Sequence, residues 1–280
     1  MLSLFLFLAL LPTPVEEPLM IYHENELIYS IDHQALQHPF LGTQMINHDQ
    51  LHEIIRTIET VVQKPAQNAT IAENGGMIAE ENGYRLNRFS MNQLIVKYFY
   101  EHGSSKIDAP IIATYPKVDT ELLAHIKTNH ISSFSTYFNK RNKKRSHNIK
   151  LAAASINNFV VFPGETFSFN HVVGKRTIER GYLPAPIIIR GELSEGVGGG
   201  ICQVSSTLYN AVDYAHLKIV ERYSHSKRVP YVPPGRDATV SWYGPDFTFQ
   251  NNYNQPVLIR SFIYGGQLTI SLFSSDDINM

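Results

Sequence analysis

Cysteine is nearly absent from this sequence, since Cys202 is the only one among 280 residues. The chain therefore has no internal disulfide, which excludes the small secreted domains that disulfides hold together. A zinc site built on paired cysteines is excluded as well, because Cys202 has no C-x-x-C partner and no histidines cluster at ligand spacing. We accordingly expect neither a metal nor a cofactor.

An excess of charge of either sign is also missing. Lys and Arg total 24 and Asp and Glu total 25, which gives a net charge of -1. Because no overall field attracts polyanions, we expect no nucleic-acid partner. Hydrophobic residues make up 43% of the chain and charged residues 18%, values typical of a globular protein with a substantial core. The length suits one large domain or two small ones.

An apolar run long enough to span a membrane is absent too. Residues 2–11 are apolar apart from Ser3, and Pro12 ends the run. This is shorter than the roughly 20 residues of a spanning helix but matches the apolar region of a secretory signal. No Lys or Arg precedes Arg56 and no A-x-A cleavage site follows, so a buried N-terminal strand or helix is the alternative.

We interpret residues 1–20 as a signal-like segment and expect an extracytoplasmic protein, either secreted or associated with the cell wall. A membrane contact is expected only if this segment stays uncleaved. Outside the cell an unpaired cysteine forms an intermolecular disulfide or is a reactive free thiol. The alternative is that Cys202 is simply a small buried hydrophobic residue, as free cysteines commonly are.

The chain divides near residue 130 into two parts, and the predicted fold class is α+β. Residues 21–130 predict a small α+β domain for binding or spacing, without clustered chemical groups. Hydrophobic periodicity predicts helices over 49–62, 91–100 and 119–126 and a strand over 111–115. A Glu-Glu-Asn-Gly turn predicts a hairpin that joins Met77 and Ile78 to Tyr84 and Leu86.

A strongly basic stretch, residues 139–150, opens the second part. Its cations are Lys140, Arg141, Lys143, Lys144, Arg145 and Lys150. The functional interpretation is contact with an anionic polymer such as wall phosphates or carboxylates, and the alternative is a solvated linker before a helix. We expect Ser146 to cap that helix, whose buried stripe would be Ile149, Ala153, Ile156 and Phe159.

Residues 131–280 are predicted to be a β-rich domain with the helix that carries Cys202 packed on its sheet. Strands are expected over 160–162, 166–170 and 187–189, and closing strands over 253–273 around the Gly265-Gly266 turn. The helix that starts at Cys202 would bury Val204, Leu208, Ala211, Val212 and Ala215. Three glycines, 198–200, precede it, and such a run suits a sharp bend or a close approach to a ligand.

The start of a helix favours a reactive thiol at Cys202. Unpaired amides and the helix dipole lower the pKa of a thiol there, and the same amides are able to hold an oxyanion. A thiol nucleophile needs a base, and His225 follows at the end of a predicted strand, with Asp237 at the start of the next. This order, cysteine then histidine then acid, matches nucleophile, base and orienting group, with Asp246 as the rival third member. The alternative is a turn-rich packed core without chemistry.

Five blocks of the second part resemble the VanW domain, in the same order along the chain. They are RSHNI (145–149), PGETFSFN (163–170), GGGICQVSSTLYN (198–210), HS (225–226) and GRDATV (235–240). The resemblance covers about residues 135–262 without a departure from the motifs. The preceding half more loosely resembles the YoaR-like peptidoglycan-binding domain that often lies before VanW domains in envelope proteins.

The resemblance implies two functions of different classes. VanW is named after vancomycin resistance clusters, and some relatives are regarded as L,D-transpeptidases with the cysteine that aligns with Cys202 as nucleophile. Such an enzyme would transfer acyl groups between peptidoglycan stem peptides. We expect Cys202 to attack, His225 to act as base and Asp237 to orient it. Substrate contacts are expected from Gly199, Gly200 and Gln203 on the oxyanion side and from Arg236 to a stem carboxylate.

The second function is a non-catalytic envelope protein that binds peptidoglycan or assists glycopeptide resistance. Cys202 would then be a packed residue or a sensor thiol. The sequence indicates no protein partner in either case. Reactivity of Cys202 toward a thiol reagent would discriminate the two, since an accessible thiol of low pKa favours the enzyme.

Overall fold

The computed structural model describes residues 17–39, 42–101, 105–189 and 192–279. Helices separate short runs of strands that form several small, mostly antiparallel sheets, which confirms the predicted α+β class. The chain forms two compact units, the first from residues 1–68 and 80–117 and the second from 69–79 and 118–280. Most of the predicted signal-like segment, residues 1–16, lies outside the described residues. None of the described helices is both long and apolar enough to cross a membrane.

The first unit packs two helices against a small sheet. In this sheet β1 (Leu19–His23) lies between β2 (Glu26–Ile31), which is antiparallel to it, and β8 (Lys106–Asp108), which is parallel. The helices are α1 (His48–Val62) and α2 (Arg88–Glu101), both close to their predicted bounds. Its smaller elements are a 3-10 helix (His33–Leu36), β3 (Gln37–His38), β4 (Gly42–Ile46), β7 (Gly83–Leu86) and β9 (Ile111–Thr114).

The predicted hairpin around residues 77–86 is wrong. Instead, β6 (Met77–Ile78) pairs with β5 (Thr70–Ile71) in the second unit, whereas β7 pairs with β9 in the first. Gly83 explains why the chain after residue 82 runs beside the backbone at Lys64 instead of folding back on Met77 and Ile78. A Cβ on Gly83 would lie 2.3 Å from the carbonyl oxygen of Lys64, so only glycine lets these two backbones run this close.

An antiparallel sheet of order β10-β18-β17-β11 forms the centre of the second unit. Its strands are β10 (Asn129–Tyr137), β18 (Gln267–Ser274), β17 (Val257–Tyr264) and β11 (Phe159–Val161). The predicted closing strands β17 and β18 are therefore confirmed. Leu268, Ile270 and Leu272 alternate with less buried residues along β18 and point into the core.

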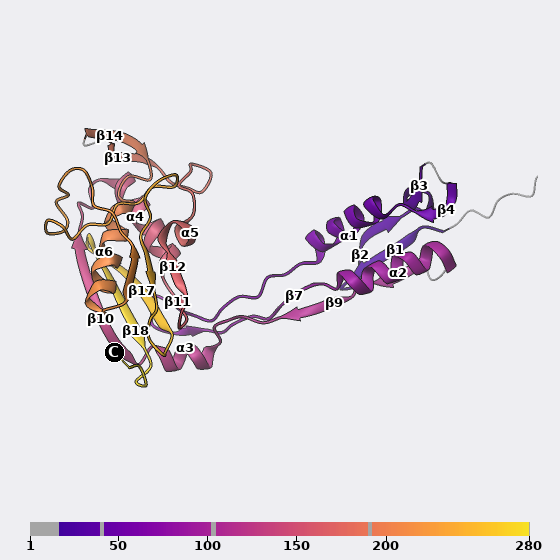
Figure 1. Cartoon of the computed structure of the whole chain (residues 1–280), viewed down its shortest axis with the longest axis horizontal. Coiled ribbons are helices and arrows are strands. Elements are labelled where there is room, and N and C mark those ends of the chain that lie inside the picture. Colours follow the sequence, from indigo (N-terminus) through magenta and orange to yellow (C-terminus); the bar gives the residue numbers. More distant parts are fainter. Residues whose placement is uncertain (1–16, 40–41, 102–104, 190–191, 280) are drawn as a thin grey trace, which may run out of the picture. The chain divides into compact units, whose positions relative to one another are not determined.

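The helix with Cys202, α6 (Ile201–Tyr214), packs on β10 and β18, as predicted (Figure 1). All five residues of its predicted stripe are buried, namely Val204, Leu208, Ala211, Val212 and Ala215. Beside α6 lies α4 (Lys143–Ile156). Asn142 caps α4 rather than the predicted Ser146, because the Asn142 side chain accepts from the amide of Arg145 one turn earlier.

Two other predicted elements end a few residues earlier than expected. Phe159 begins β11 instead of extending the stripe of α4, since the helix ends at Ile156. The strand predicted to reach residue 170 ends as β12 (Thr166–Ser168), because Ser168 caps the short helix α5 (Phe169–Val173). A second sheet, β12-β16-β15, is completed by β15 (Lys218–Glu221) and β16 (Thr248–Gln250).

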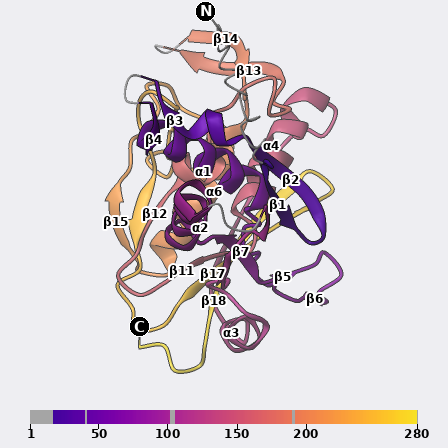
Figure 2. The ribbon, with the colours of Figure 1, turned by 90° about the vertical axis from the view of Figure 1, so that its right-hand side faces the viewer.

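Two elements mark opposite ends of the second unit. The hairpin of β13 (Pro184–Ile189) and β14 (Glu192–Val197) lies at one end in both views, and α3 (Thr120–Ile126), capped by Asp119 as predicted, lies at the other (Figures 1 and 2). Strand β14 leads directly into the three glycines and α6. The hairpin thus places the glycine loop at one end of the unit.

Candidate active site

The N-terminus of α6 presents Cys202 as the second residue of the helix, after Gly200 as its cap. Gly200 has φ +107°, and its carbonyl oxygen accepts from the amide of Gln203 at 3.1 Å. Among the described residues, the Cys202 amide has no hydrogen-bond acceptor. This amide is one of the unpaired donors at the start of α6, and the oxyanion role predicted for this turn stays a prediction.

Buried polar side chains of α6 hold the segment that carries Asp237. Ser206 Oγ accepts from the amide of Ala238 at 2.9 Å and donates to the carbonyl of Cys202 at 2.7 Å. Ser205 Oγ donates to the carbonyl of Ala238 at 2.6 Å, and Asn210 Nδ2 donates to that of Arg236 at 2.7 Å. The predicted strand over 238–242 is wrong, because side chains of α6 bind this backbone in place of a neighbouring strand.

His225 is fixed by Asp237, the acid predicted to orient it. Asp237 Oδ2 lies 2.6 Å from both the backbone N and the side-chain Nδ1 of His225. A carboxylate only accepts, so Nδ1 carries a proton and Nε2 remains for the thiol. The side chains of His225 and Asp237 are 7% and 10% exposed, which shields their bond from water. Asp246 is engaged elsewhere, accepting from Ser168 Oγ at 2.6 Å.

Cys202 is half-buried, and its Sγ lies 3.5 Å from the carbonyl oxygen of Val240 and 3.9 Å from Oγ1 of Thr239. Burial raises the pKa of the Cys202 thiol, but the hydrogen bond and charge of His225 outweigh this, and the pKa lies below its ordinary value. Burial lowers the pKa of His225, yet its interactions with Cys202 and Asp237 raise the pKa above the ordinary value. The two shifts together favour a thiolate–imidazolium pair.

Cys202 and His225 face one cavity of about 930 Å³. Its lining contains three cations, Arg145, Lys175 and Arg176, and neither Asp nor Glu among the described residues. Tyr231 and Trp242 also line it. Burial raises the pKa of the Tyr231 hydroxyl, so this group stays protonated and able to donate at neutral pH.

Sequence reasoning missed most of these cavity residues. Arg145 lies in the basic stretch, but its Nη2 donates to Gln203 Oε1 at 2.7 Å instead of facing a polymer or solvent alone. Arg176 and Tyr231 carried no signal, since each is a single residue in a turn-rich segment. Four other cations of the stretch line a separate cavity of about 570 Å³, namely Lys140, Arg141, Lys143 and Lys150, and contact with an anionic polymer there stays a prediction.

The three residues predicted to contact substrate on the oxyanion side differ in their surroundings. The side chain of Gln203 is fully buried and donates to Thr136 Oγ1 at 2.9 Å, so it positions Arg145 and holds α6 to β10. Gly199 lies against the backbone of β13, where a Cβ would come within 2.6 Å of Ala185. Gly200 lines the cavity beside Cys202. The two glycines thus shape the loop more than they contact its open space.

Arg236 is not brought to the cavity. Its Nε donates to Asn210 Oδ1 and its Nη1 to Asp213 Oδ2, both at 2.6 Å. The guanidinium also lies over the rings of Tyr209 and Tyr214. This geometry ties Arg236 to the later turns of α6, and the cations that face a ligand at Cys202 are Arg145, Lys175 and Arg176 instead.

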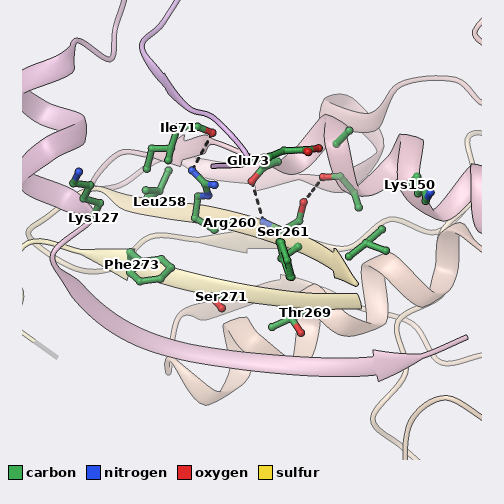
Figure 3. A pocket seen from close by; sticks show the side chains of 15 residues that line it. Ile71, Glu73, Lys127, Lys150, Leu258, Arg260, Ser261, Thr269, Ser271 and Phe273 are labelled. Carbon is green, nitrogen blue, oxygen red and sulfur yellow. Dashed lines mark hydrogen bonds between the residues drawn. The ribbon is translucent and has the colours of Figure 1, made fainter. Parts of the chain in front are cut away.

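A second cavity, of about 780 Å³, lies over β17 and contains no His or Cys among its described lining residues (Figure 3). Two of its polar side chains, Arg260 and Ser261, are hydrogen-bonded to backbone carbonyls of the lining. Arg260 Nη1 donates to the carbonyl of Ile71 at 3.2 Å, and Ser261 Oγ donates to that of Ala153 at 2.7 Å. These bonds hold the 69–79 segment and α4 to β17, which is a structural role.

The chain is similar to proteins of one known family. The family model described as VanW like protein matches residues 144–273. The uncharacterized protein YoaR of Bacillus subtilis (strain 168) is 52% identical over 274 residues, which cover 98% of this chain and 90% of that protein. The vancomycin B-type resistance protein VanW of Enterococcus faecalis (strain ATCC 700802 / V583) is 30% identical over 129 residues, 44% of this chain and 46% of that protein. No solved structure is significantly similar. The chain belongs to the VanW-like family.

Proposed function

We propose that this chain is a cysteine acyltransferase of the cell envelope that acts on peptidoglycan stem peptides in the manner of an L,D-transpeptidase. The observation that carries the proposal is that Cys202, in the first turn of α6, lines the same cavity as His225, whose imidazole a buried carboxylate orients. The lowered pKa of the thiol agrees with this geometry. Nucleophile, base and orienting group are the parts that covalent acyl transfer requires.

The reaction would proceed in two halves. The thiolate of Cys202 attacks the carbonyl carbon of a peptide bond, and the amide of Cys202 binds the developing oxyanion. When the C–N bond breaks, the leaving amine takes the proton from Nε2 of His225, and a thioester remains on Cys202. An amine of a second stem peptide then attacks the thioester and loses its proton to His225, and the S–C bond breaks to release the thiolate of Cys202. This step forms the cross-link and restores the thiolate–imidazolium pair.

Two further observations support a wall substrate. One relative carries vancomycin B-type resistance in its name, and vancomycin acts on wall peptides. The cavity, at about 930 Å³, is large enough for several residues of a peptide and is lined by cations that suit the carboxylates of a stem peptide.

The test incubates the purified full chain with disaccharide-tetrapeptide fragments and follows products by mass spectrometry. We expect wild type to form a covalent acyl adduct and cross-linked dimers, whereas Cys202→Ala forms neither. His225→Gln should lose turnover as well. His171→Gln is the matched control, because His171 is an exposed histidine of the same unit that does not line the cavity, and it should keep full activity.

Absence of both adduct and dimer from folded wild type would overturn the enzyme. It would favour the alternative of a binding or resistance accessory protein, in which Cys202 acts as a packed or sensing thiol. Binding of intact peptidoglycan by Cys202→Ala at wild-type affinity, without any turnover by wild type, would establish that alternative.

A further inference from the structure

We propose that Arg176 binds the C-terminal carboxylate of the peptide that Cys202 attacks, so that the reaction is confined to the last amide bond of the chain. The inference rests on the proposed acyl transfer and names its specificity. In the first half-reaction, the Sγ–C bond forms, the last C–N bond breaks, and His225 gives its proton to the amine that leaves. The leaving group is then a single amino acid, and its carboxylate is the group that Arg176 holds.

The first observation is an orphaned guanidinium. Both terminal nitrogens of Arg176 are buried, and neither has a hydrogen-bond partner among the described residues. Buried donors are ordinarily bonded, because an unpaired donor loses its contacts with water without replacement. Burial lowers the pKa of Arg176, partly offset by charge on Cys202 and Tyr182. A buried cation without an acceptor fits a site completed by an anionic ligand.

The second observation is the cradle built around this side chain. Gly198 packs against its stem, where a Cβ would lie 3.1 Å from Cβ of Arg176, and the ring of Phe169 lies 5.7 Å below the guanidinium. Gly200 in the same way leaves room for Arg145, whose Cγ would lie 2.9 Å from an added Cβ. The glycine run therefore packs against Arg176 at Gly198 and against Arg145 at Gly200, next to the helix start that presents Cys202.

The third observation is that no carboxylate among the described residues is hydrogen-bonded to the terminal nitrogens of Arg176. Asp246 interacts with it electrostatically, but its oxygens accept from Ser168 Oγ at 2.6 Å and from the amides of Asn170 and Phe247 at 2.9 and 2.8 Å. The described lining of the cavity holds no carboxylate. The planar fork of an arginine binds a carboxylate through two parallel hydrogen bonds, which suits a peptide terminus beside the thiol.

The test compares alkylation of Cys202 by iodoacetate and iodoacetamide, reagents that form the same S–C bond and release iodide but differ in a carboxylate. The ratio of the rate constant for iodoacetate to that for iodoacetamide reports carboxylate binding, because the intrinsic reactivity of the thiol affects both rate constants equally. We expect Arg176→Met to lower this ratio by about 10- to 100-fold, as for loss of hydrogen bonds to a charged group. Lys175→Met, which removes another cation of the same cavity, should change it far less.

Each outcome separates the inference from the function on which it rests. An unchanged ratio in Arg176→Met, with fast alkylation by iodoacetamide, would overturn carboxylate binding and leave the nucleophile intact. An equal fall in Lys175→Met would assign the effect to the general field and also overturn it. Alkylation of wild type by iodoacetamide no faster than that of the urea-unfolded chain would overturn the activated nucleophile and this inference with it.

A second readout guards against a merely structural role. Because the terminal nitrogens of Arg176 make no hydrogen bonds in the described protein, Arg176→Met should unfold in urea at a midpoint no lower than wild type. With a tetrapeptide and its C-terminal amide as substrates, wild type should turn over the acid at least about tenfold faster, and Arg176→Met should treat the two alike. A clearly lowered midpoint together with retained preference for the acid would make Arg176 structural.

Discussion

The two compact units differ in what they bury. All buried polar or charged side chains among the described residues lie in the second unit, and most of them surround α6 and the segment it holds. The side chains that the first unit buries in its core are apolar, although single polar atoms such as Thr114 Oγ1 are also buried there. Burying polar groups lowers stability unless each is bonded, so a cluster of them indicates a constraint beyond packing. In this chain the constraint is the position of Asp237 and His225 relative to Cys202.

The helices α1 and α6 show the same contrast. Both have an apolar stripe, but the polar face of α1 is exposed to solvent whereas that of α6 is covered by residues 236–240. Ser205, Ser206 and Asn210 each bond the backbone of that segment. A helix whose polar face is buried acts as a template for the chain laid over it.

The largest effect is expected from a change at Asp237, the residue that the segment over α6 holds against His225. Asp237→Asn removes the carboxylate that fixes and charges His225, and we expect the rate of acyl transfer to fall by about 10²- to 10⁴-fold, the usual contribution of acid–base catalysis. The matched control in the first unit is Asp49→Asn, an exposed carboxylate in the first turn of α1, which should leave the rate unchanged. Turnover measured by mass spectrometry checks both.

The pH dependence of alkylation by iodoacetamide sharpens the same point. The pKa of Cys202 is lowered in the folded chain, so thiolate and reactivity should rise with pH with a midpoint below the ordinary thiol pKa of about 8.5. In Asp237→Asn the imidazolium loses its counter-charge, and the midpoint should move up toward that ordinary value. Identical profiles for the two proteins would contradict the link from Asp237 through His225 to the thiol.

Local periodicity made the helices and their buried stripes predictable from the sequence. The partner of each strand was not predictable in this way. The stripe from Val204 to Ala215 follows from helical spacing alone. The hairpin predicted at residues 77–86 failed because strand pairing depends on distant segments, here Thr70–Ile71 and Ile111–Thr114.

Some residues of the candidate site were predictable from the sequence, and others were not. The order of Cys202, His225 and Asp237 was readable, but the choice between Asp237 and Asp246 required three-dimensional proximity. Arg176 could not be found, because a single arginine in a turn has no pattern until Gly198 is packed on its stem.

A smaller effect tests the glycine loop against an ordinary turn. Gly200→Ala places a Cβ at φ +107° and within 2.9 Å of Arg145, so strain and overpacking combine, and we expect a loss of about 3 kcal/mol in the free energy of unfolding. Gly164→Ala, at φ +78° in open space, should lose only about 1 kcal/mol. Urea unfolding followed by Trp242 fluorescence reports on the second unit, since this is the only tryptophan. Equal losses would show that the loop does not press on Arg145.

The smallest expected effect compares one hydroxyl from each unit. Ser206→Ala leaves the buried amide of Ala238 without its acceptor, and we expect a loss of about 1 to 2 kcal/mol in the free energy of unfolding. Thr57→Ala removes an exposed hydroxyl that bonds the carbonyl of Glu53 within α1, and it should change stability by less than about 0.5 kcal/mol. Urea unfolding by circular dichroism measures both, with Trp242 fluorescence for the second unit.

If α6 sets the position of Asp237, Ser206→Ala should also slow alkylation of Cys202, because the register of Asp237 on α6 is loosened. A variant that loses stability yet keeps wild-type alkylation at every pH would limit Ser206 to packing.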